Sequence, residues 1–320
     1  MPELPEVQTT VNGLKKTIVG LKITDVWTDL AVKNPTRKDY YDTIKSSAFF
    51  TTFKKKVVGA KVISAERRAK NILINLSSGN TILIHLKMTG HLLFGLYEYD
   101  KNKNVWSPSA KEKNQALRDP YNRFVHVVFS FSNNPKSKDR ASKHLAFCDT
   151  RKFGKVTLVD TKTAHETSHL QKIGPEPFDK NFTVKVLRER LLKRPMWNTK
   201  TALMNQEIVA GIGNIYSDEL LWLAGIHPEQ KVKTLKKKDF KKIFDSALSV
   251  LTKGIDFGGD SMSDYRNIHG ERGEFQHTHN AYRKTGSKCS KRGCEGIITR
   301  KVIDGRSAHF CPLHQKLFKE

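Results

Sequence analysis

The sequence predicts a multidomain α+β protein. Apolar residues recur at helical spacing near the N-terminus, short apolar runs follow to about residue 160, and helical spacing returns after a proline-containing segment. A chain of 320 residues is long enough for two or three compact domains. We therefore expect an N-terminal helix with a β-sandwich, then a helical domain that contains two helices joined by a glycine turn, and finally a small C-terminal β-hairpin domain.

The N-terminal segment has two interpretations. Its apolar residues mark an amphipathic helix, which Pro2 can start and glutamates can favour at the positive end. The second interpretation is chemical. Removal of Met1 would make Pro2 a secondary amine with a pKa of about 8, beside the carboxylate of Glu3. Such an amine can attack an electrophilic carbon.

The region after this helix is rich in strand-like runs. Several are apolar on both faces, which indicates two packed sheets rather than a sheet with one wet face. The clearest runs are 71–76, 81–86, 124–129 and 155–160. Two polar, lysine-rich stretches, 100–114 and 133–143, interrupt them, and we expect surface insertions there.

The predicted domains are 1–160 for the β-sandwich, 161–182 for a linker, 183–275 for the helical domain and 276–320 for the hairpin domain. The linker contains Gly174-Pro-Glu-Pro177, which cannot continue a helix or a central strand. Residues 203–222 form two helical stretches around a turn that contains Gly211 and Gly213. Such a turn exposes backbone N–H groups that can hold a phosphate oxygen.

The charge of the chain indicates a polyanionic partner. It carries 57 Lys and Arg against 32 Asp and Glu, a formal charge of +25. Nucleic acid fits best, because neutralised phosphates release counterions, although ribosomes or anionic membranes also attract a basic chain. The start is acidic and no apolar run reaches membrane-spanning length. We expect a cytoplasmic, nucleoid-associated protein that is not secreted.

The C-terminus has the spacing of a zinc site. Four candidate ligands follow the pattern Cys289-x4-Cys294-x16-Cys311-x2-His314. Four protein ligands leave no open position, so one structural Zn²⁺ is expected. His309 could replace His314, and three unrelated cysteines with a surface histidine is the remaining alternative. The lone Cys148 is expected to be a buried, small apolar residue.

The motifs occur in the order of one known family. They are Pro2-Glu-Leu-Pro-Glu-Val7, Arg67-Arg-Ala-Lys70, His85-Leu-Lys-Met-Thr-Gly90, Asp149-Thr-Arg-Lys-Phe-Gly154, Gly174-Pro-Glu-Pro177, the helix-two-turns-helix block around Asn214, Gly258-Gly259 and the zinc finger. Over almost its whole length the chain resembles bacterial formamidopyrimidine-DNA glycosylase, whose wider family includes endonuclease VIII. The resemblance implies a bifunctional enzyme that excises oxidised purines and cuts the DNA by β,δ-elimination.

The resemblance also implies roles for individual residues. Pro2 would attack C1′ of the extruded nucleotide and form an iminium, while Glu3 would move protons at the sugar. Glu6 would support this site, unless it is a solvent-facing helix residue. Lys70 and Arg306 would complete the catalytic set, and both would clamp phosphates together with Asn214. Arg306 lies at the expected turn of a hairpin over 297–310.

Further DNA contacts follow from the same likeness. The gap left by the extruded nucleotide would be filled by Met88, Arg151 and Phe153, and Arg151 would pair with the orphaned cytosine. Other expected contacts are His91, Lys200, Gly213, Ile215, Tyr216 and Tyr282. The expected partner is double-stranded DNA with oxidised bases or abasic sites, bound by a monomer that needs no membrane and no small-molecule cofactor.

Two departures separate the chain from the family pattern. The finger ends in Cys-x2-His and its first pair is four residues apart. The loop 260–269, which by the resemblance would cover the extruded base, lacks the usual Thr-x-x-Asp-Phe form. The enzyme could therefore prefer oxidised pyrimidines, as endonuclease VIII does, instead of oxidised purines. A noncatalytic protein that binds damaged or bent DNA is an alternative of another class.

Overall fold

The computed structural model describes residues 1–132, 142–262 and 264–318, so most of the expected insertion 133–143 lies outside the described residues. The chain divides into two compact units, and each is described by itself. Unit 1 contains Met1–Pro2, Glu6–Gln171 and Gly258–Gly273, and unit 2 contains Glu3–Pro5, Lys172–Phe257 and Glu274–Glu320. The segment Gly258–Gly273 therefore packs with unit 1, although the sequence analysis assigned it to the helical domain.

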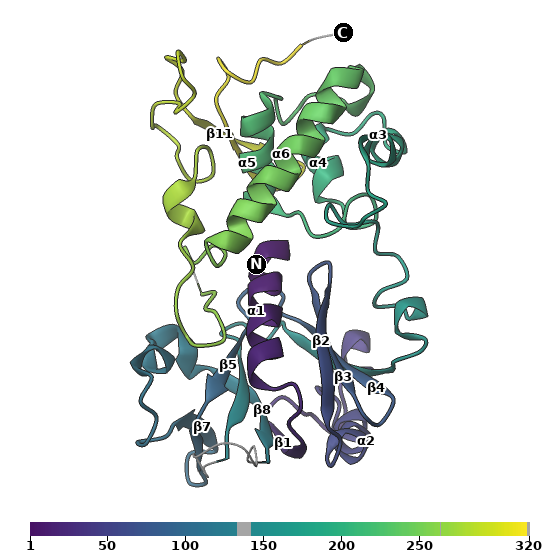
Figure 1. Cartoon of the computed structure of the whole chain (residues 1–320), viewed down its shortest axis with the longest axis vertical. Coiled ribbons are helices and arrows are strands. Elements are labelled where there is room, and N and C mark those ends of the chain that lie inside the picture. The colour runs from purple at the N-terminus through teal and green to yellow at the C-terminus, as the bar shows by residue number, and fades with distance from the viewer. Residues whose placement is uncertain (133–141, 263, 319–320) are drawn as a thin grey trace. The chain divides into compact units, whose positions relative to one another are not determined.

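Unit 1 contains two four-stranded antiparallel sheets (Figure 1). Their strand orders are β1-β8-β9-β5 and β10-β4-β3-β2, and a separate hairpin pairs β6 with β7. The strands are β1 (Ile23–Thr28), β2 (Val62–Arg68), β3 (Asn71–Leu76), β4 (Asn80–His85), β5 (His91–Gly95), β6 (Tyr97–Asp100), β7 (Val105–Pro108), β8 (Val125–Phe131), β9 (His144–Cys148) and β10 (Lys155–Asp160).

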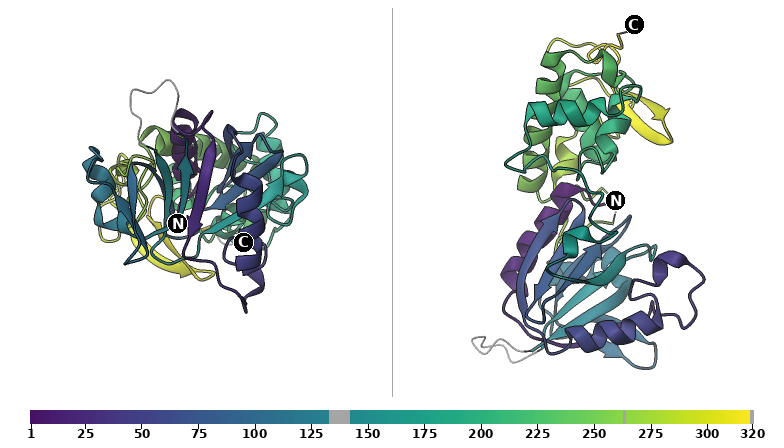
Figure 2. Two further views of the ribbon diagram at one scale, coloured as in Figure 1. Left: turned by 90° about the horizontal axis from the view of Figure 1, so that it is seen from below. Right: turned by 90° about the vertical axis from the view of Figure 1, so that its right-hand side faces the viewer.

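One apolar core joins the two sheets of unit 1. Buried residues of both sheets belong to the same cluster as those of α1 (Leu4–Thr17) and α2 (Ser47–Val57). The apolar stripe of α1 is fully buried, as its spacing predicted. Ser46 caps α2 by accepting a hydrogen bond from the Phe49 N–H. The predicted β-sandwich with an N-terminal helix is confirmed, and Figure 2 shows its stacked sheets.

Unit 2 contains the remaining helices. They are α3 (Val184–Leu192), α4 (Thr199–Met204), α5 (Asn214–Ala224) and α6 (Lys237–Asp256). The helices α4 and α5 with the turns between them form the predicted helix-two-turns-helix. Short 3₁₀ helices occur in both units: η1 (Lys38–Tyr40), η2 (Gln115–Arg118), η3 (Pro120–Arg123), η4 (Ala164–Glu166), η5 (Val232–Thr234) and η6 (Phe275–Thr278). None of the helices in the described residues is long and apolar enough to cross a membrane.

The C-terminal hairpin consists of β11 (Thr299–Ile303) and β12 (Arg306–Phe310). Its turn has two residues, Asp304 and Gly305, both with positive φ (46° and 76°). This is the backbone that a tight hairpin turn requires, and Asp-Gly suits it. Asp304 also accepts hydrogen bonds from Asn198 Nδ2 (3.1 Å) and Thr201 Oγ1 (2.5 Å), so the turn is fixed to the start of α4.

Candidate active site and nucleic-acid interface

The carboxylate of Glu3 lies at the N-terminus of α5. It accepts hydrogen bonds from the backbone N–H groups of Gly213 (2.5 Å), Ile215 (2.9 Å) and Tyr216 (3.4 Å). Glu3 is only 2% exposed. These donors are the unpaired N–H groups of the first helical turn, at the positive end of the helix dipole, and they stabilise the ionised carboxylate. The structure thus gives Glu3 one defined position.

Two glycines make room for the N-terminal residues. A Cβ on Gly213 would lie 2.4 Å from the carboxyl carbon of Glu3, so any side chain there would displace the acid. Gly211 has φ of +96°, and its carbonyl accepts a hydrogen bond from the Leu4 N–H (3.0 Å). The glycines that sequence analysis assigned to phosphate binding therefore receive the residue next to Pro2.

Glu6 is buried rather than facing solvent. It is 1% exposed, and its Oε1 accepts a hydrogen bond from the Asp260 N–H (2.7 Å). Its backbone carbonyl accepts from the Tyr265 hydroxyl (2.9 Å). The alternative of a solvent-facing Glu6 is wrong, because the segment after Gly258 covers this side chain.

A basic pocket of about 380 Å³ lies beside Met1 in unit 1. Burial lowers the pKa of Lys45 and of Lys87, which indicates that an anion there would stabilise the charged lysines. The pocket also contains Met88 and Phe153, both partly exposed, together with Arg37, Asp39, Tyr40 and Lys155. Pro2 itself is buried.

Met88, Arg151 and Phe153 lie on two turns that a buried carboxylate ties together. Asp149 is 0% exposed and accepts hydrogen bonds from the Thr89 hydroxyl and from the Gly154 N–H (2.7 Å). The Arg151 guanidinium lies 4.6 Å from the centre of the Phe153 ring. Met88 (38% exposed) and Phe153 (44%) are too exposed to be core residues. Sequence analysis gave Asp149 no role, although it opens the motif that contains Arg151.

Lys70 occupies the two-residue turn between β2 and β3. It is 4% exposed and follows Ala69, which has φ of +52°. Arg67 supports this turn by donating to the Ala69 carbonyl (3.1 Å) and to Gln8 Oε1 on α1 (2.8 Å). The turn therefore has a defined backbone, and Lys70 is enclosed rather than extended into solvent.

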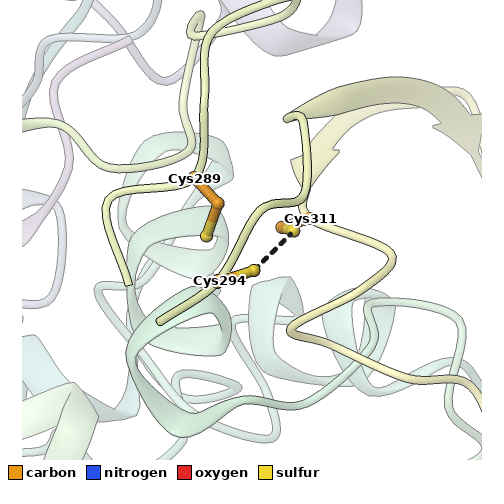
Figure 3. Close-up of side chains that lie close together, drawn as sticks. All are labelled: Cys289, Cys294 and Cys311. Atoms are coloured by element: carbon orange, nitrogen blue, oxygen red, sulfur yellow. Dashed lines mark hydrogen bonds between the residues drawn. The ribbon is translucent and has the colours of Figure 1, made fainter. Parts of the chain in front are cut away.

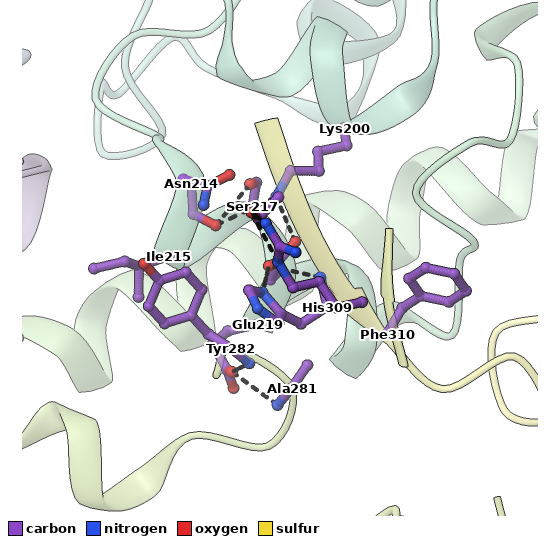
Figure 4. A network of polar contacts seen from close by, with 12 residues as sticks. Lys200, Asn214, Ile215, Ser217, Glu219, Ala281, Tyr282, His309 and Phe310 are labelled. Carbon is purple, nitrogen blue, oxygen red and sulfur yellow. Dashed lines mark hydrogen bonds and ion pairs between the residues drawn. The ribbon is translucent and has the colours of Figure 1, made fainter. Parts of the chain in front are cut away.

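Unit 2 contains a buried polar network, in which Figure 4 labels Lys200, Asn214 and His309. Asp218 is the acceptor that joins Lys200 to His309. Asp218 Oδ1 accepts from Lys200 Nζ (2.5 Å), and Oδ2 accepts from the His309 backbone N–H and ring Nδ1 (2.9 Å each). Lys200 also donates to the Asn214 carbonyl (3.4 Å). Burial lowers the pKa of Lys200, and Asp218 opposes that shift. The network ties α4, α5 and β12 to one another.

The next residue of α5 holds a different segment. Glu219, 2% exposed, accepts hydrogen bonds from the backbone N–H groups of Asn280, Ala281 and Tyr282 (2.8–2.9 Å; Figure 4). Asp218 and Glu219 were not among the predicted site residues. Their signal was two adjacent acids in an otherwise apolar helix, since such acids are buried only with partners.

Arg306 is exposed and lies directly after the hairpin turn, as predicted. The turn is held by Asp304, and the other end of β12 is held by Asp218 through His309. A basic side chain on an anchored hairpin can contact a phosphate with little loss of conformational entropy.

Several predicted DNA contacts are buried. His91 (1% exposed), Lys200 (1%) and Tyr216 (0%) have partners within their own units, and the Gly213 N–H donates to Glu3. His91 Nε2 donates to Asn122 Oδ1 (2.8 Å). Burial favours a structural role for these side chains, and their contact with DNA stays a prediction. Asn214, Ile215 and Tyr282 are partly exposed.

The three cysteines at the C-terminus lie together (Figure 3). The Sγ atoms of Cys289, Cys294 and Cys311 are within 4.8 Å of one another, close enough to bind one metal ion. The N–H groups of Gly296 and His314 each lie 3.4 Å from a sulfur, an arrangement that favours thiolate. Cys148 is separate and fully buried, as expected. The alternative of three unrelated cysteines is therefore wrong.

The predicted fourth ligand, His314, does not belong to this group of three cysteines. His314 Nε2 donates to the Trp222 carbonyl (2.8 Å), which leaves Nδ1 as the nitrogen able to bind a metal. His309, the alternative ligand, has its Nδ1 on Asp218. The donor set fits a structural zinc, with three cysteine sulfurs close together and one imidazole three residues after Cys311.

The fold and the site define a class: a β-sandwich with a buried N-terminal carboxylate, a helix-two-turns-helix, and a cysteine-rich hairpin. The family model of the formamidopyrimidine-DNA glycosylase N-terminal domain matches residues 1–156, and that of the H2TH domain matches residues 173–266. The formamidopyrimidine-DNA glycosylase of Ligilactobacillus salivarius is 34% identical over 98% of each chain. That of Brevibacillus brevis is 35% identical over 99% of each chain.

Solved structures of formamidopyrimidine-DNA glycosylases are similar to this chain over almost its whole length. The Lactococcus lactis Fpg in complex with DNA containing an abasic site has a TM-score of 0.79 and 30% identity, covering 98% of this chain and 99% of that one. The wild-type Fpg of the same species with a N7-Benzyl-Fapy-dG containing DNA has a TM-score of 0.77 and 30% identity, covering 98% of this chain and 100% of that one. The chain belongs to the formamidopyrimidine-DNA glycosylase family of DNA-repair glycosylases.

Proposed function

We propose that the protein excises oxidised purines from duplex DNA and cleaves the resulting abasic site. The observation that carries this proposal is the fixed position of Glu3, directly after Pro2, on the N-terminus of α5. Simple phosphate binding requires neither a proline amine nor a buried carboxylate next to it. Attack at C1′ of a sugar uses a nucleophilic amine, and opening of the sugar ring uses a group that moves protons, so the two residues together fit this chemistry.

The proposed reaction balances through these two residues. After removal of Met1, the Pro2 nitrogen attacks C1′, the bond from C1′ to the base breaks, and the base leaves with the electron pair of that bond and takes a proton from water. The Pro2 nitrogen loses its own proton to Glu3, which then protonates O4′ as the sugar ring opens to an iminium. Loss of a C2′ proton breaks the C3′–O bond, and loss of a C4′ proton breaks the C5′–O bond. Because Glu3 first accepts a proton, its ionised form suits this sequence.

The remaining site residues support binding in this proposal. Lys70, Asn214 and Arg306 contact phosphates around the extruded nucleotide, and Met88, Arg151 and Phe153 fill the gap it leaves. Zinc would be bound by Cys289, Cys294, Cys311 and His314, where it would stabilise the hairpin and take no part in the reaction. Arg151 at the purine-type motif supports oxidised purines opposite cytosine rather than oxidised pyrimidines.

Borohydride trapping tests the proposal. Protein whose loss of Met1 is verified by mass spectrometry should form a covalent adduct with a duplex containing 8-oxoguanine, and Pro2→Gly should form little. A binder without catalysis would give a bound complex and no adduct. Comparing release of 8-oxoguanine with release of thymine glycol from matched duplexes separates the purine and pyrimidine alternatives, and absence of purine release would contradict our choice.

A further inference from the structure

Residues 264–271 of unit 1 pack against residues 114–122, which begin at the end of the polar stretch 100–114. Asn114 Nδ2 donates to the His269 carbonyl (2.8 Å), and Asn122 Nδ2 lies 3.5 Å from the Gly270 carbonyl. On its other side the segment pairs with β5, where the Phe94 N–H donates to the Ile268 carbonyl (2.8 Å). Backbone groups of the segment are therefore bonded on two sides.

A buried ion pair fixes the centre of this contact. Arg266 is 0% exposed, and its guanidinium has three contacts of 3.1–3.3 Å with the carboxylate of Asp119, which is 25% exposed. The same guanidinium lies 4.8 Å from the centre of the Tyr121 ring and donates to the Tyr265 carbonyl (2.9 Å). A buried arginine is unfavourable without such a partner, so Arg266 and Asp119 hold each other in place.

A second contact explains why His91 is buried. His91 Nε2 donates to Asn122 Oδ1, and Asn122 Nδ2 donates to the Ala116 carbonyl (2.9 Å). A Cβ on Gly270 would lie 2.7 Å from that carbonyl, and Gly270 has φ of +84°. His91 and Asn122 thus shape a surface that accepts only glycine at position 270.

The same segment is tied to the first helix. The Tyr265 hydroxyl donates to the Glu6 carbonyl (2.9 Å), three residues after Glu3 in the sequence. Thr10 Oγ1 on α1 lies 3.5 Å from that hydroxyl. Residues 264–271 are therefore anchored between the insertion side of unit 1 and the helix that begins at the proposed active site.

We propose that Asp119 and Arg266 are positioning residues for base excision, which hold residues 264–271 in one conformation before DNA binds. This inference rests on the proposed function, in which the resemblance assigns the loop after Gly259 to covering the extruded base. If the segment is already ordered in the free protein, binding of a lesion does not have to supply the conformational entropy of ordering it. An abasic site has no base to cover, so the strand-cleaving step on abasic DNA should not need the pair.

The test compares two substrates in one sequence context, a duplex with 8-oxoguanine and the same duplex with an abasic site. Asp119→Asn keeps an oxygen that can accept from the Tyr121 N–H (2.9 Å) but removes the charge that pairs with Arg266. If the ordered form falls to about a tenth of the population, kcat/KM for base release falls about tenfold. Cleavage of the abasic duplex should stay at the wild-type rate. Amides of residues 264–271 should exchange faster in the free variant.

Two further variants keep the inference open to refutation if Asp119→Asn is unstable. Asn114→Asp keeps the oxygen that accepts from the Ala116 N–H and removes the donor to the His269 carbonyl, so it loosens only the segment. It should reproduce the selective loss. Asp25→Asn is the matched control, since it removes the charge of an exposed pair with Lys54 and should leave both substrates unaffected.

Equal rates of base release in wild type, Asp119→Asn and Asn114→Asp would overturn the inference, and so would equal loss on both substrates with intact folding. Failure of the proposed function has another signature: the wild-type protein itself would give no base release and no borohydride adduct.

Discussion

At the scale of single residues, Glu3 explains why the N-terminal sequence cannot be only a helix start. A glutamate that merely favoured the helix dipole of α1 would point at the N–H groups of its own helix, whereas Glu3 accepts from those of α5. We expect Glu3→Gln to reduce single-turnover release of 8-oxoguanine about 100-fold or more, the range for loss of a general acid or base. Cleavage of a preformed abasic site should fall much less.

The same substitution should lower stability. The amide group of glutamine cannot accept from all three N–H groups, and an unpaired buried donor costs about 1–3 kcal/mol. Urea unfolding of Glu3→Gln measures this loss. Equal reduction of both activities, with DNA affinity unchanged, would contradict the division of roles between Glu3 and Pro2.

His91 gives a pH prediction. Burial lowers its pKa in the folded state, so above about pH 6.5 it is neutral whether the chain is folded or not. Below that pH the unfolded chain gains a proton that the folded chain resists, and the free energy of unfolding falls, by at most about 1.4 kcal/mol per pH unit for one group. His91→Gln should reduce the difference in unfolding free energy between pH 7.5 and 5.5. An unchanged difference would mean that His91 is not the titrating group.

Much of the site could be predicted, but its internal partners could not. Pro2, Glu3 and the cysteines lie in short motifs whose chemistry is visible in the sequence. The acceptor role of Glu3 toward Gly213 joins residues 210 positions apart, and no local pattern encodes that pairing. His91 shows the converse, since the resemblance implied a DNA contact and the structure places its ring against Asn122.

At the scale of elements, the predicted strands agree with the observed ones where the pattern of apolar residues in the sequence is regular. The strands β3 and β10 match their predicted ranges because β3 is almost wholly buried and β10 is buried or half-buried up to its last residue. The strand β1 was not predicted, because its burial alternates irregularly around a bulge near Asp25. The packing of the segment after Gly258 with unit 1 has no local signal, since long-range contacts such as Arg266 with Asp119 decide its position.

The cysteine-rich element gives a prediction about ligands. We expect one zinc per chain, and we expect His314→Asn to weaken zinc binding about tenfold or more in competition with a chelator. His309→Asn should not, because its Nδ1 already contacts Asp218. Metal content and chelator titration of the two variants check this. The opposite ranking would make His309 the ligand.

At the scale of the whole molecule, the charge of +25 exceeds what a few phosphate contacts require. Such a surplus acts through the summed field, which raises the local concentration of DNA and is screened by salt. The polar stretch 100–114 contributes four exposed lysines, at positions 101, 103, 111 and 113. Their distance in sequence from the catalytic motifs suggests a role in nonspecific affinity alone.

Changing these four lysines to glutamine lowers the formal charge from +25 to +21 and tests that role. We expect weaker binding to undamaged duplex and a shallower dependence of log K on log salt, by about 0.9 for each lost phosphate contact. Base release at saturating DNA should be unchanged, because no catalytic group is altered. Binding isotherms between 50 and 200 mM salt, about the range over which such contacts separate clearly, give the slope. An unchanged slope with slower release would instead connect the insertion to the chemical step, through its contact with residues 264–271.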